Sequence, residues 1–503
     1  MDKLGLLSSK VAENKKVLQK KFALAADAVF RDGYLGGDKK IPFLLFYLDN
    51  TVNGEVINRD ILSPLLYEQH LERKWTSLSG DLREILQKNC NSGAQLKEVD
   101  SWEELLPLVL YGWIAVFLEG ERTALLLQSP GWPKRSPSSP QMEKEALSSR
   151  VGLVENLADN IALLRMRLRS LDLAVERTDV GNFVPSYVGI VYMQSRVDQK
   201  LLKRIKEKLN ELNVEGLILS GELTQFLEDN PFYFFPKTRI TQRMELITAS
   251  LVEGKIVLIL DGSPYAIIFP ISVQSFFVVS DDYSERYIPA SFLRVIRILA
   301  LFIAILLPGF YTALATLNMD LIPYDMLLNI ARSRQSVIFS PLQESLFLGF
   351  FLDVLQEGSL RVPGPISQTV GIVGGIALGQ AIVSAKIVGP MVVIIISLTA
   401  VSSFVASSYR LTLVLKVLRV AFILLGGFLG LYGLTLGILF MFTILAATNS
   451  FNEPYFAPYA PFGLQNMKDG IIKFPPSLGA TFLKKNRKVL QEEKNDRRTT
   501  SDN

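Results

Sequence analysis

The most constraining feature of this sequence is the uneven distribution of its apolar residues. From Met1 to about Pro289, apolar runs stay short and charged residues recur throughout. From Ile298 to Thr448, several runs approach the roughly 20 apolar residues that a helix needs to cross ~30 Å of hydrocarbon. The 503-residue chain is 49% hydrophobic, with a mean hydropathy of +0.27, which is high for a soluble protein. We therefore expect a soluble first half and a second half that lies in a membrane.

The side of the membrane follows from the first residues. The N-terminal stretch "MDKLGLLSSKVAENKKVLQKKF" has no uninterrupted apolar segment of the kind that directs export, so we expect the soluble half to lie in the cytoplasm. A net charge of +4 is small for a chain of this length. It gives no reason to expect a nucleic-acid partner.

Motifs that carry enzyme chemistry are absent from the sequence. Cys90 and His70 are the only residues of their types, which excludes an intrachain disulfide and a Cys/His metal cluster. The chain contains no G-x-x-x-x-G-K-[ST] loop, no G-x-S-x-G elbow and no H-E-x-x-H helix. We expect no metal, no cofactor and no enzymatic activity, and interpret the soluble half as a sensing or assembly module.

The soluble half contains one plan twice. The stretch "PFLLFYLDNTVNGEVINRDILSPLL" predicts a strand, a turn and a helix, and two short strands follow in "WIAVFLEGERTALLLQ". The stretch "YVGIVYMQSRVDQKLLKRIKEKLNEL" predicts the same series, followed by a hairpin in "KIVLILDGSPYAIIFP" that turns at Asp261 and Gly262. We infer two related cytoplasmic α/β subdomains.

These patterns divide the chain into four parts. Residues 1–140 form the first α/β subdomain and end in a Pro/Ser-rich linker, and residues 141–290 form the second subdomain. Residues 291–465 form a helical transmembrane domain, and residues 466–503 form a basic tail that we expect to be disordered and cytoplasmic. The predicted fold class is thus α+β followed by an α-helical membrane domain of about four spans with an amphipathic interfacial helix.

A basic helix is predicted at the start of the second subdomain. Its apolar stripe consists of Leu157, Ile161, Leu164 and Leu168. Arg165, Arg167 and Arg169 lie off this stripe, which favours a solvated face that is paired with carboxylates such as Asp159. Contact with anionic lipid is the alternative.

Four membrane spans are predicted, at Ile298–Leu317, Ile366–Ala385, Val388–Ser407 and within Val417–Ala447. The last segment would make a helix of roughly 46 Å, so it tilts strongly, breaks or partly re-enters. An even number of spans returns the basic tail to the cytoplasmic side, as the positive-inside rule requires. The same count places three basic residues, Arg410, Lys416 and Arg419, on the outer side, in conflict with that rule.

Three carboxylates lie in a predicted helix between the first two spans. Ser340, Pro341 and Gln343 form an N-terminal capping box with proline at the first helical position. A helical wheel separates two faces, of which one carries Ser345, Gly349, Asp353, Gln356 and Glu357 and the other carries Phe347, Phe351, Val354 and Leu355. We predict an interfacial amphipathic helix. Glu344, Asp353 and Glu357 are candidate functional carboxylates, although Glu344, in the first turn, could equally just complement the helix dipole.

Two sets of small residues predict close helix packing. They are Gly371, Gly375 and Gly379 in the second span, and Gly426, Gly430, Gly433 and Gly437 in the last. A second face of the second span carries Thr369, Val373, Gln380 and Ser384. Polar groups in a span need protein partners or water, so this stripe either contacts another helix or lines an aqueous path with Val373 as an apolar constriction.

Several segments together resemble the GerA family of spore germination proteins, specifically the A subunit of nutrient germinant receptors. They are "INRDIL", "NIALLRMRLRS", "LVEGKIVLILDGSPYAIIFP", "FLRVIRILALFIAILLPGFYTAL", "VGIVGGIALGQAIVSAKIV" and "PYFAPYAPF", between about Leu44 and Phe462. The sequence departs from the family pattern at "SSRVGL", at Gly349 in place of a common glutamate, and at "SFVASSY", which lacks a usual proline.

The resemblance implies a role in triggering germination in the inner membrane of the bacterial spore. It also implies three kinds of protein partner: a multi-spanning B subunit that resembles an amino-acid transporter, a lipoprotein C subunit, and further copies of the chain in a homo-oligomer that conducts ions. A non-conducting scaffold subunit and a stand-alone transporter are the alternatives. A transporter would normally show two matched sets of spans, which this sequence lacks.

Overall fold

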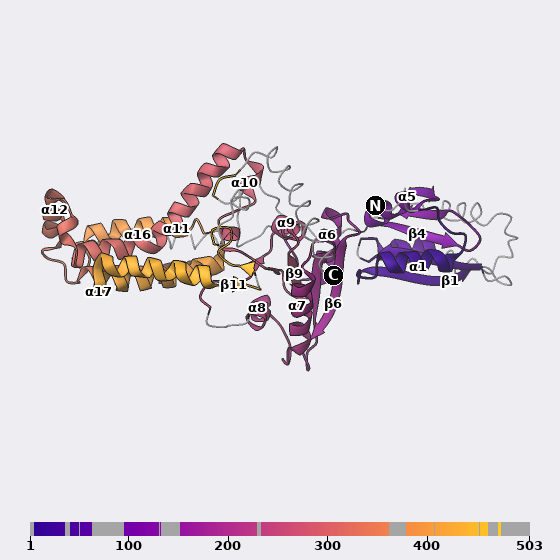
Figure 1. Ribbon diagram of the computed structural model, residues 1–503, viewed down its shortest axis with the longest axis horizontal. Helices are drawn as coiled ribbons and strands as arrows, with labels where there is room; N and C mark the ends of the chain where they lie inside the picture. The colour runs from indigo at the N-terminus through magenta and orange to yellow at the C-terminus, as the bar shows by residue number, and fades with distance from the viewer. Residues whose placement is uncertain are drawn as a thin grey trace, which may run out of the picture. The chain divides into compact units, whose positions relative to one another are not determined.

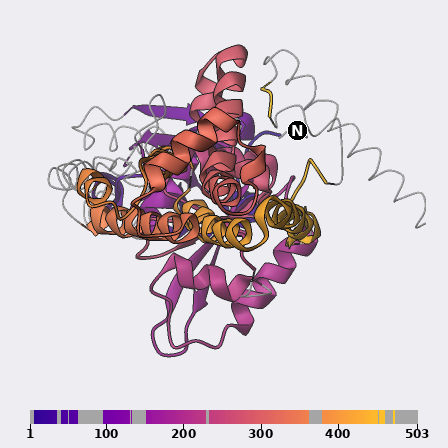
Figure 2. The same cartoon turned by 90° about the vertical axis from the view of Figure 1, so that its left-hand side faces the viewer.

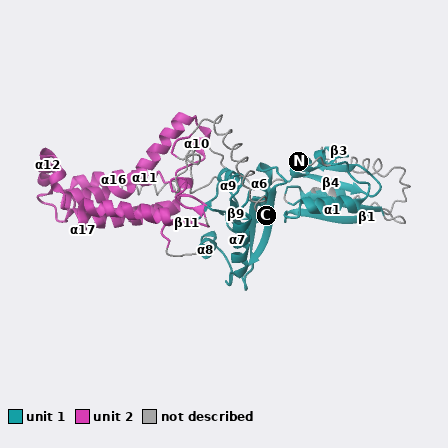
Figure 3. Ribbon diagram, viewed as in Figure 1, with its two compact units in different colours: residues 1–141, 149–231, 238–270 teal, residues 142–148, 232–237, 271–503 magenta. Residues whose placement is uncertain are grey.

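The computed structural model describes residues 5–35, 41–49, 51–62, 95–129, 131, 151–228, 233–361, 379–406, 408–451, 453–460 and 471–473. The chain divides into two compact units (Figure 3). Unit 1 comprises residues 1–141, 149–231 and 238–270, and unit 2 comprises the remaining residues.

The first half of unit 1 is a five-stranded antiparallel sheet. Its strands lie in the order β1 (Ala28–Leu35), β2 (Ile41–Leu48), β4 (Trp113–Leu118), β5 (Ala124–Gln128) and β3 (Leu96–Val99). The central strands β2 and β4 are almost wholly apolar because both faces of the sheet are covered. One face packs against α1 (Val11–Lys21) and α5 (Trp102–Leu110), and the other packs against residues that include Ile57 and Ile61 of the helical segment Gly54–Leu62.

The second half of unit 1 repeats this topology. Its antiparallel strands lie in the order β6 (Leu173–Val180), β7 (Ser186–Met193), β9 (Ile256–Leu260), β10 (Ala266–Phe269) and β8 (Arg239–Thr241). The helices of this half are α6 (Leu157–Arg167), α7 (Gln199–Glu211), α8 (Ser220–Leu227) and α9 (Met244–Glu253). The common strand order agrees with the prediction of two subdomains built on one plan. The hairpin predicted at Asp261 and Gly262 is also confirmed, since β9 and β10 pair across that turn.

A buried ion pair joins the two halves of unit 1. The side chain of Arg165 on α6 is 1% exposed and donates from Nε and Nη2 to the two carboxylate oxygens of Asp27, at 2.9 and 2.8 Å. Its Nη1 donates to the carbonyl of Leu173, and Ala25 forms a parallel bridge with Val175 of β6. The prediction that Arg165 lies on a solvated face is therefore wrong, because its partner comes from the other subdomain.

Unit 2 is largely helical. Its helices are α10 (Asp281–Ser284), α11 (Tyr287–Thr316), α12 (Tyr324–Arg334), α13 (Pro341–Arg361), α15 (Gly379–Ser384), α16 (Pro390–Ser403) and α17 (Tyr409–Ala447). Helices α11, α16 and α17 lie side by side (Figures 1 and 2). Among the described residues, α11 and α17 are the helices long and apolar enough to cross a membrane.

Helix α17 folds back on itself at Gly430. The backbone there is non-helical, with φ 63° and ψ −148°. A Cβ placed on Gly437 would lie 2.7 Å from Leu425 Cδ1 and 2.8 Å from Phe422 Cε1. Residues 422 and 437 of one straight helix would be about 22 Å apart along its axis, so these contacts require two antiparallel arms. Residues 409–429 form the first arm and residues 431–447 the second, with lengths of about 30 Å and about 25 Å.

The arms have a definite direction relative to α11. Asn318, just past the end of α11, accepts a hydrogen bond from the N–H of Leu431 at the fold-back turn. At the opposite end, Tyr455 accepts from the N–H of Val273, which precedes α11. Both open ends of α17 therefore lie where α11 begins, and the turn lies where α11 ends.

The predicted set of four spans needs correction. Helix α11 starts at Tyr287 instead of Ile298, and α16 covers only Pro390–Ser403. The span expected at residues 366–385 lies outside the described residues up to 378, and its described part ends with α15 at Ser384. The last segment contributes two arms in place of one span. Arg410 consequently lies at the open end of the first arm, and Lys416 and Arg419 lie six and nine residues further along it, so Arg419 is near the middle of the arm.

Candidate functional site: the polar interior of the helical unit

Helix α13 turns its polar face toward protein. Its predicted capping box is confirmed, because the Ser340 N–H donates to Gln343 Oε1 at 3.0 Å and the Gln343 N–H donates to Ser340 Oγ at 3.4 Å. Glu344 and Ser345 are buried, whereas Phe350 is 70% exposed. The polar face is covered in part by protein, since Ser345 contacts α11 and Asp353 contacts α17. That α13 is an interfacial amphipathic helix stays a prediction.

Glu344 is fully buried and links three segments of unit 2. Its Oε1 lies 3.0 Å from Nη2 of Arg334 at the end of α12, and its Oε2 accepts from the N–H of Gly389 at 3.2 Å, just before α16. Arg334 also donates to the carbonyl of Phe339. The Glu344 carboxylate therefore does more than complement the dipole of α13, because it binds both Arg334 at the end of α12 and the backbone of Gly389 just before α16. Sequence reasoning missed Arg334, which no local pattern marks as a partner.

A hydroxyl pair lies next along α13. The hydroxyls of Thr312 of α11 and Ser345 lie 2.9 Å apart, and the Thr312 hydroxyl donates to the carbonyl of Pro308 at 2.8 Å. Both side chains are buried. The pair satisfies polar groups that would otherwise be unpaired between two helices.

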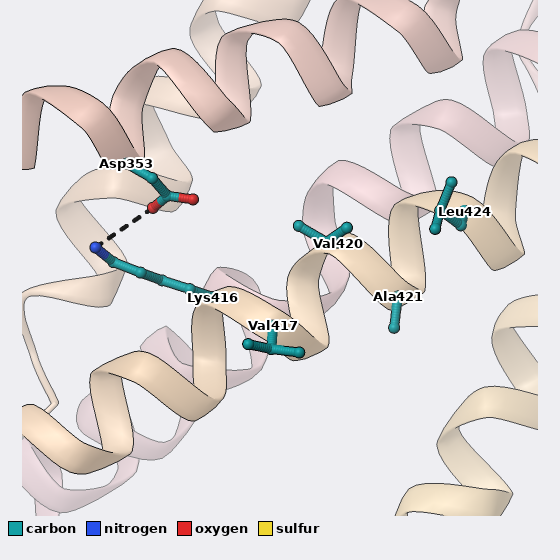
Figure 4. A pocket seen from close by; sticks show the side chains of 6 residues that line it. All are labelled: Asp353, Lys416, Val417, Val420, Ala421 and Leu424. Atoms are coloured by element: carbon teal, nitrogen blue, oxygen red, sulfur yellow. Dashed lines mark ion pairs between the residues drawn. The ribbon is translucent and has the colours of Figure 1, made fainter. Parts of the chain in front are cut away.

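Asp353 forms the third polar contact of α13. Its Oδ2 lies 2.6 Å from Nη2 of Arg419, and its Oδ1 lies 3.5 Å from Nζ of Lys416 (Figure 4). Both basic residues belong to the first arm of α17, and the Arg419 side chain is 3% exposed. Glu357, one turn further along α13, is partly buried. The structure thus brings Glu344 and Asp353, which lie on opposite faces of α13, to separate cationic partners.

The glycines of α17 serve two different contacts. A Cβ on Gly426 would overlap the carbonyl of Gly309 in α11, and a Cβ on Gly309 would lie 2.5 Å from the carbonyl of Phe422. Gly433 and Gly437 lie between the two arms, and Gly430 forms the turn itself. Gly426 alone of these four approaches another helix at its backbone.

The other predicted site residues lie in or near α15. Gly371, Gly375, Thr369 and Val373 lie outside the described residues. Gly379 has no heavy atom within 4 Å of a Cβ placed on it, so the described part of the chain presents no close neighbour there. Gln380 and Ser384 are exposed.

These features define a chain with a two-sheet α+β unit and a helical unit that buries its charges and carries helices of membrane-crossing length. The chain belongs to the Bacillus/Clostridium GerA spore germination protein family, whose model matches residues 16–481.

Two relatives from Bacillus subtilis (strain 168) match along most of their length. Spore germination protein B1 is 32% identical over a match that covers 93% of this chain and 95% of the B1 chain. Spore germination protein KA is 30% identical over a match that covers 93% of this chain and 85% of the KA chain. Among solved structures, the N-terminal domain of the A subunit of the Bacillus megaterium spore germinant receptor GerK3 covers 53% of this chain and 97% of its own, with 20% identity and a TM-score of 0.41.

Proposed function

We propose that this protein is a multi-pass membrane subunit of a spore nutrient germinant receptor. The observation that carries the proposal is the inside-out character of unit 2. Its buried positions include the ion pairs of Glu344 and Asp353, while large apolar side chains are exposed. Those above 60% include Phe292, Phe350, Ile394, Phe428, Tyr432, Leu439 and Phe440. A soluble protein rarely exposes so many large apolar side chains to water, whereas the hydrocarbon of a membrane solvates such side chains well.

The proposed orientation follows from the charges of α17. Its basic residues Arg410, Lys416 and Arg419 all lie in the first arm, with Arg410 at the end where α11 begins and Arg419 near the middle, and residues that precede α11 lead into unit 1. Basic residues favour the cytoplasmic side of a membrane. The sheets of unit 1 and both chain termini would then lie on the cytoplasmic side of the inner spore membrane.

The proposed activity is ion release through an oligomer of this chain. Gln380 and Ser384 are exposed polar residues on α15, and the family resemblance implies an oligomeric ion-conducting path formed by such subunits. Polar side chains within a membrane need water or protein, and a ring of subunits around an aqueous path would supply it. Nutrient sensing would then come from the multi-spanning B subunit, with the lipoprotein C subunit as a further partner.

Single-channel recording tests this proposal, with the purified protein alone and with its partners. We expect Val373→Ser to leak cations without nutrient, because a polar side chain favours the wet state of an apolar constriction, and Gln380→Leu to slow ion release after nutrient is supplied. A scaffold subunit would give no currents. If both variants lower receptor abundance and neither leaks, the stripe packs against protein and is not the gate.

A further inference from the structure

A groove between α13 and the first arm of α17 remains unexplained by the proposed ion path. It is a hollow of about 430 Å³ lined by Asp353, Lys416, Val417, Val420, Ala421 and Leu424 (Figure 4). The polar residues Asp353 and Lys416 lie at one end, and the other four side chains are apolar. The groove is therefore amphiphilic, with a charged head region at one end and an apolar strip along the rest.

The head region carries a surplus positive charge. Arg419 is almost fully buried and takes the shorter contact with Asp353, at 2.6 Å, so it neutralises that carboxylate within the protein. Lys416 lies 3.5 Å from the same carboxylate, which is beyond an ordinary hydrogen bond, and lines the hollow. Two cations thus share the Asp353 carboxylate, and Lys416, which makes the longer ion pair and lines the hollow, is the one whose ammonium can also bind an anion.

The apolar region suits an acyl chain. Val417, Val420 and Leu424 are 56%, 41% and 37% exposed and follow one another along one face of α17. From Val417 to Leu424 the helix rises about 10 Å, so several methylene groups of a lipid would contact this strip. In the proposed orientation, Lys416 lies nearer the cytoplasmic end of the first arm than Leu424 does, which matches the head-to-tail direction of a lipid in the cytoplasmic leaflet.

We propose that this groove binds an anionic phospholipid of the cytoplasmic leaflet, with the headgroup phosphate on Lys416 and one acyl chain along Val417–Leu424. The inference rests on the proposed membrane location of unit 2. It does not depend on whether the protein conducts ions.

Lipid titration of the full-length protein in neutral detergent tests the site, with native mass spectrometry as the readout. The probes are phosphatidylglycerol, phosphatidylcholine and inorganic phosphate. We expect preference for phosphatidylglycerol and a loss of about fivefold in its affinity for Lys416→Gln, the effect of one lysine near anionic lipid. Ala421→Trp, which fills the groove from an exposed position, should remove most of the binding. Lys386→Gln and Ala446→Trp are matched controls at exposed positions outside the groove, and should bind normally.

Several results would overturn the lipid site. Equal binding of the two lipids, unchanged binding by both groove variants, or saturation of the site by inorganic phosphate alone would do so. If Ala421→Trp instead lowers the oligomer size and leaves lipid binding intact, the groove holds a second copy of the chain. Extraction of the protein from membranes without detergent would refute the membrane location itself, which separates that failure from a failure of the lipid site.

Discussion

The substitution Gly430→Ala, which adds one methyl group at the turn, tests whether α17 folds back on itself. The φ of 63° and ψ of −148° at Gly430 lie in a region that is essentially restricted to glycine. A Cβ there would also overlap Oδ1 of Asn318, the oxygen that accepts the Leu431 N–H at 2.9 Å. Gly430→Ala therefore strains the turn and displaces its hydrogen-bond acceptor at once.

The expected cost follows from these two effects. A residue held in such a backbone region costs about 1–3 kcal/mol. Loss of the Asn318 hydrogen bond adds about 1 kcal/mol. We expect Gly430→Ala to lower the free energy of unfolding of unit 2 by about 2–4 kcal/mol in total. Asn318→Ala alone should cost about 1 kcal/mol, and the double variant should cost less than the two single changes together, because both remove the same hydrogen bond.

Gly358→Ala is the matched control. Gly358 lies in the helical part of α13, is exposed, and has no heavy atom within 4 Å of a Cβ placed on it. Alanine favours a helix over glycine by about 1 kcal/mol, so this variant should be neutral or slightly more stable. The assay is reversible unfolding of the purified protein by SDS in mixed micelles, followed by far-UV circular dichroism. If Gly430→Ala unfolds at the same SDS fraction as Gly358→Ala, α17 does not turn at this residue.

Two further predictions concern the joint within unit 1 and the direction of α17. Arg165→Ala leaves the Asp27 carboxylate buried without its guanidinium partner, so it should lower the free energy of unfolding of unit 1 by about 3–5 kcal/mol in urea. The control Arg122→Ala changes an exposed residue and should alter the free energy of unfolding by less than about 0.5 kcal/mol. Equal effects of the two variants would show that the ion pair does not hold the two sheets together. In a cysteine-free background, cysteines at Leu321 and Tyr432 should react with an impermeant label from the outer side of the membrane and a cysteine at Ser9 should not. Labelling of Leu321→Cys and Tyr432→Cys from opposite sides would exclude the fold-back.

Features with a local cause could be predicted from the sequence. The hairpin at Asp261 and Gly262 has its turn residues between two apolar runs, and the box of Ser340 and Gln343 has its spacing in four consecutive residues. Contacts between distant residues could not be predicted in this way. Arg165 and Asp27 are 138 residues apart, and nothing in the surroundings of either residue indicates the other.

The glycines of α17 show how a correct pattern supports a wrong geometry. A helical wheel places Gly426, Gly430, Gly433 and Gly437 on one face only if the helix is continuous. With the break at Gly430, the last two glycines face their own first arm, while Gly426 faces α11. The signal for the break was the length of the apolar segment, which is too long for one upright crossing. Spacing alone cannot distinguish contact between helices from contact within a hairpin.

Helix α13 shows the same limit for charge. Its wheel separates a polar face from an apolar face, but a wheel does not say whether the polar face contacts water, lipid headgroups or protein. Whether the polar face contacts protein depends on whether a neighbouring helix places residues of opposite charge next to it. Lys416 and Arg419 are cations within the mainly apolar first arm of α17, and both lie opposite Asp353. Charges are costly in an apolar helix unless they are paired, so such cations, together with an acidic face elsewhere in the chain, indicate that the two elements pack together.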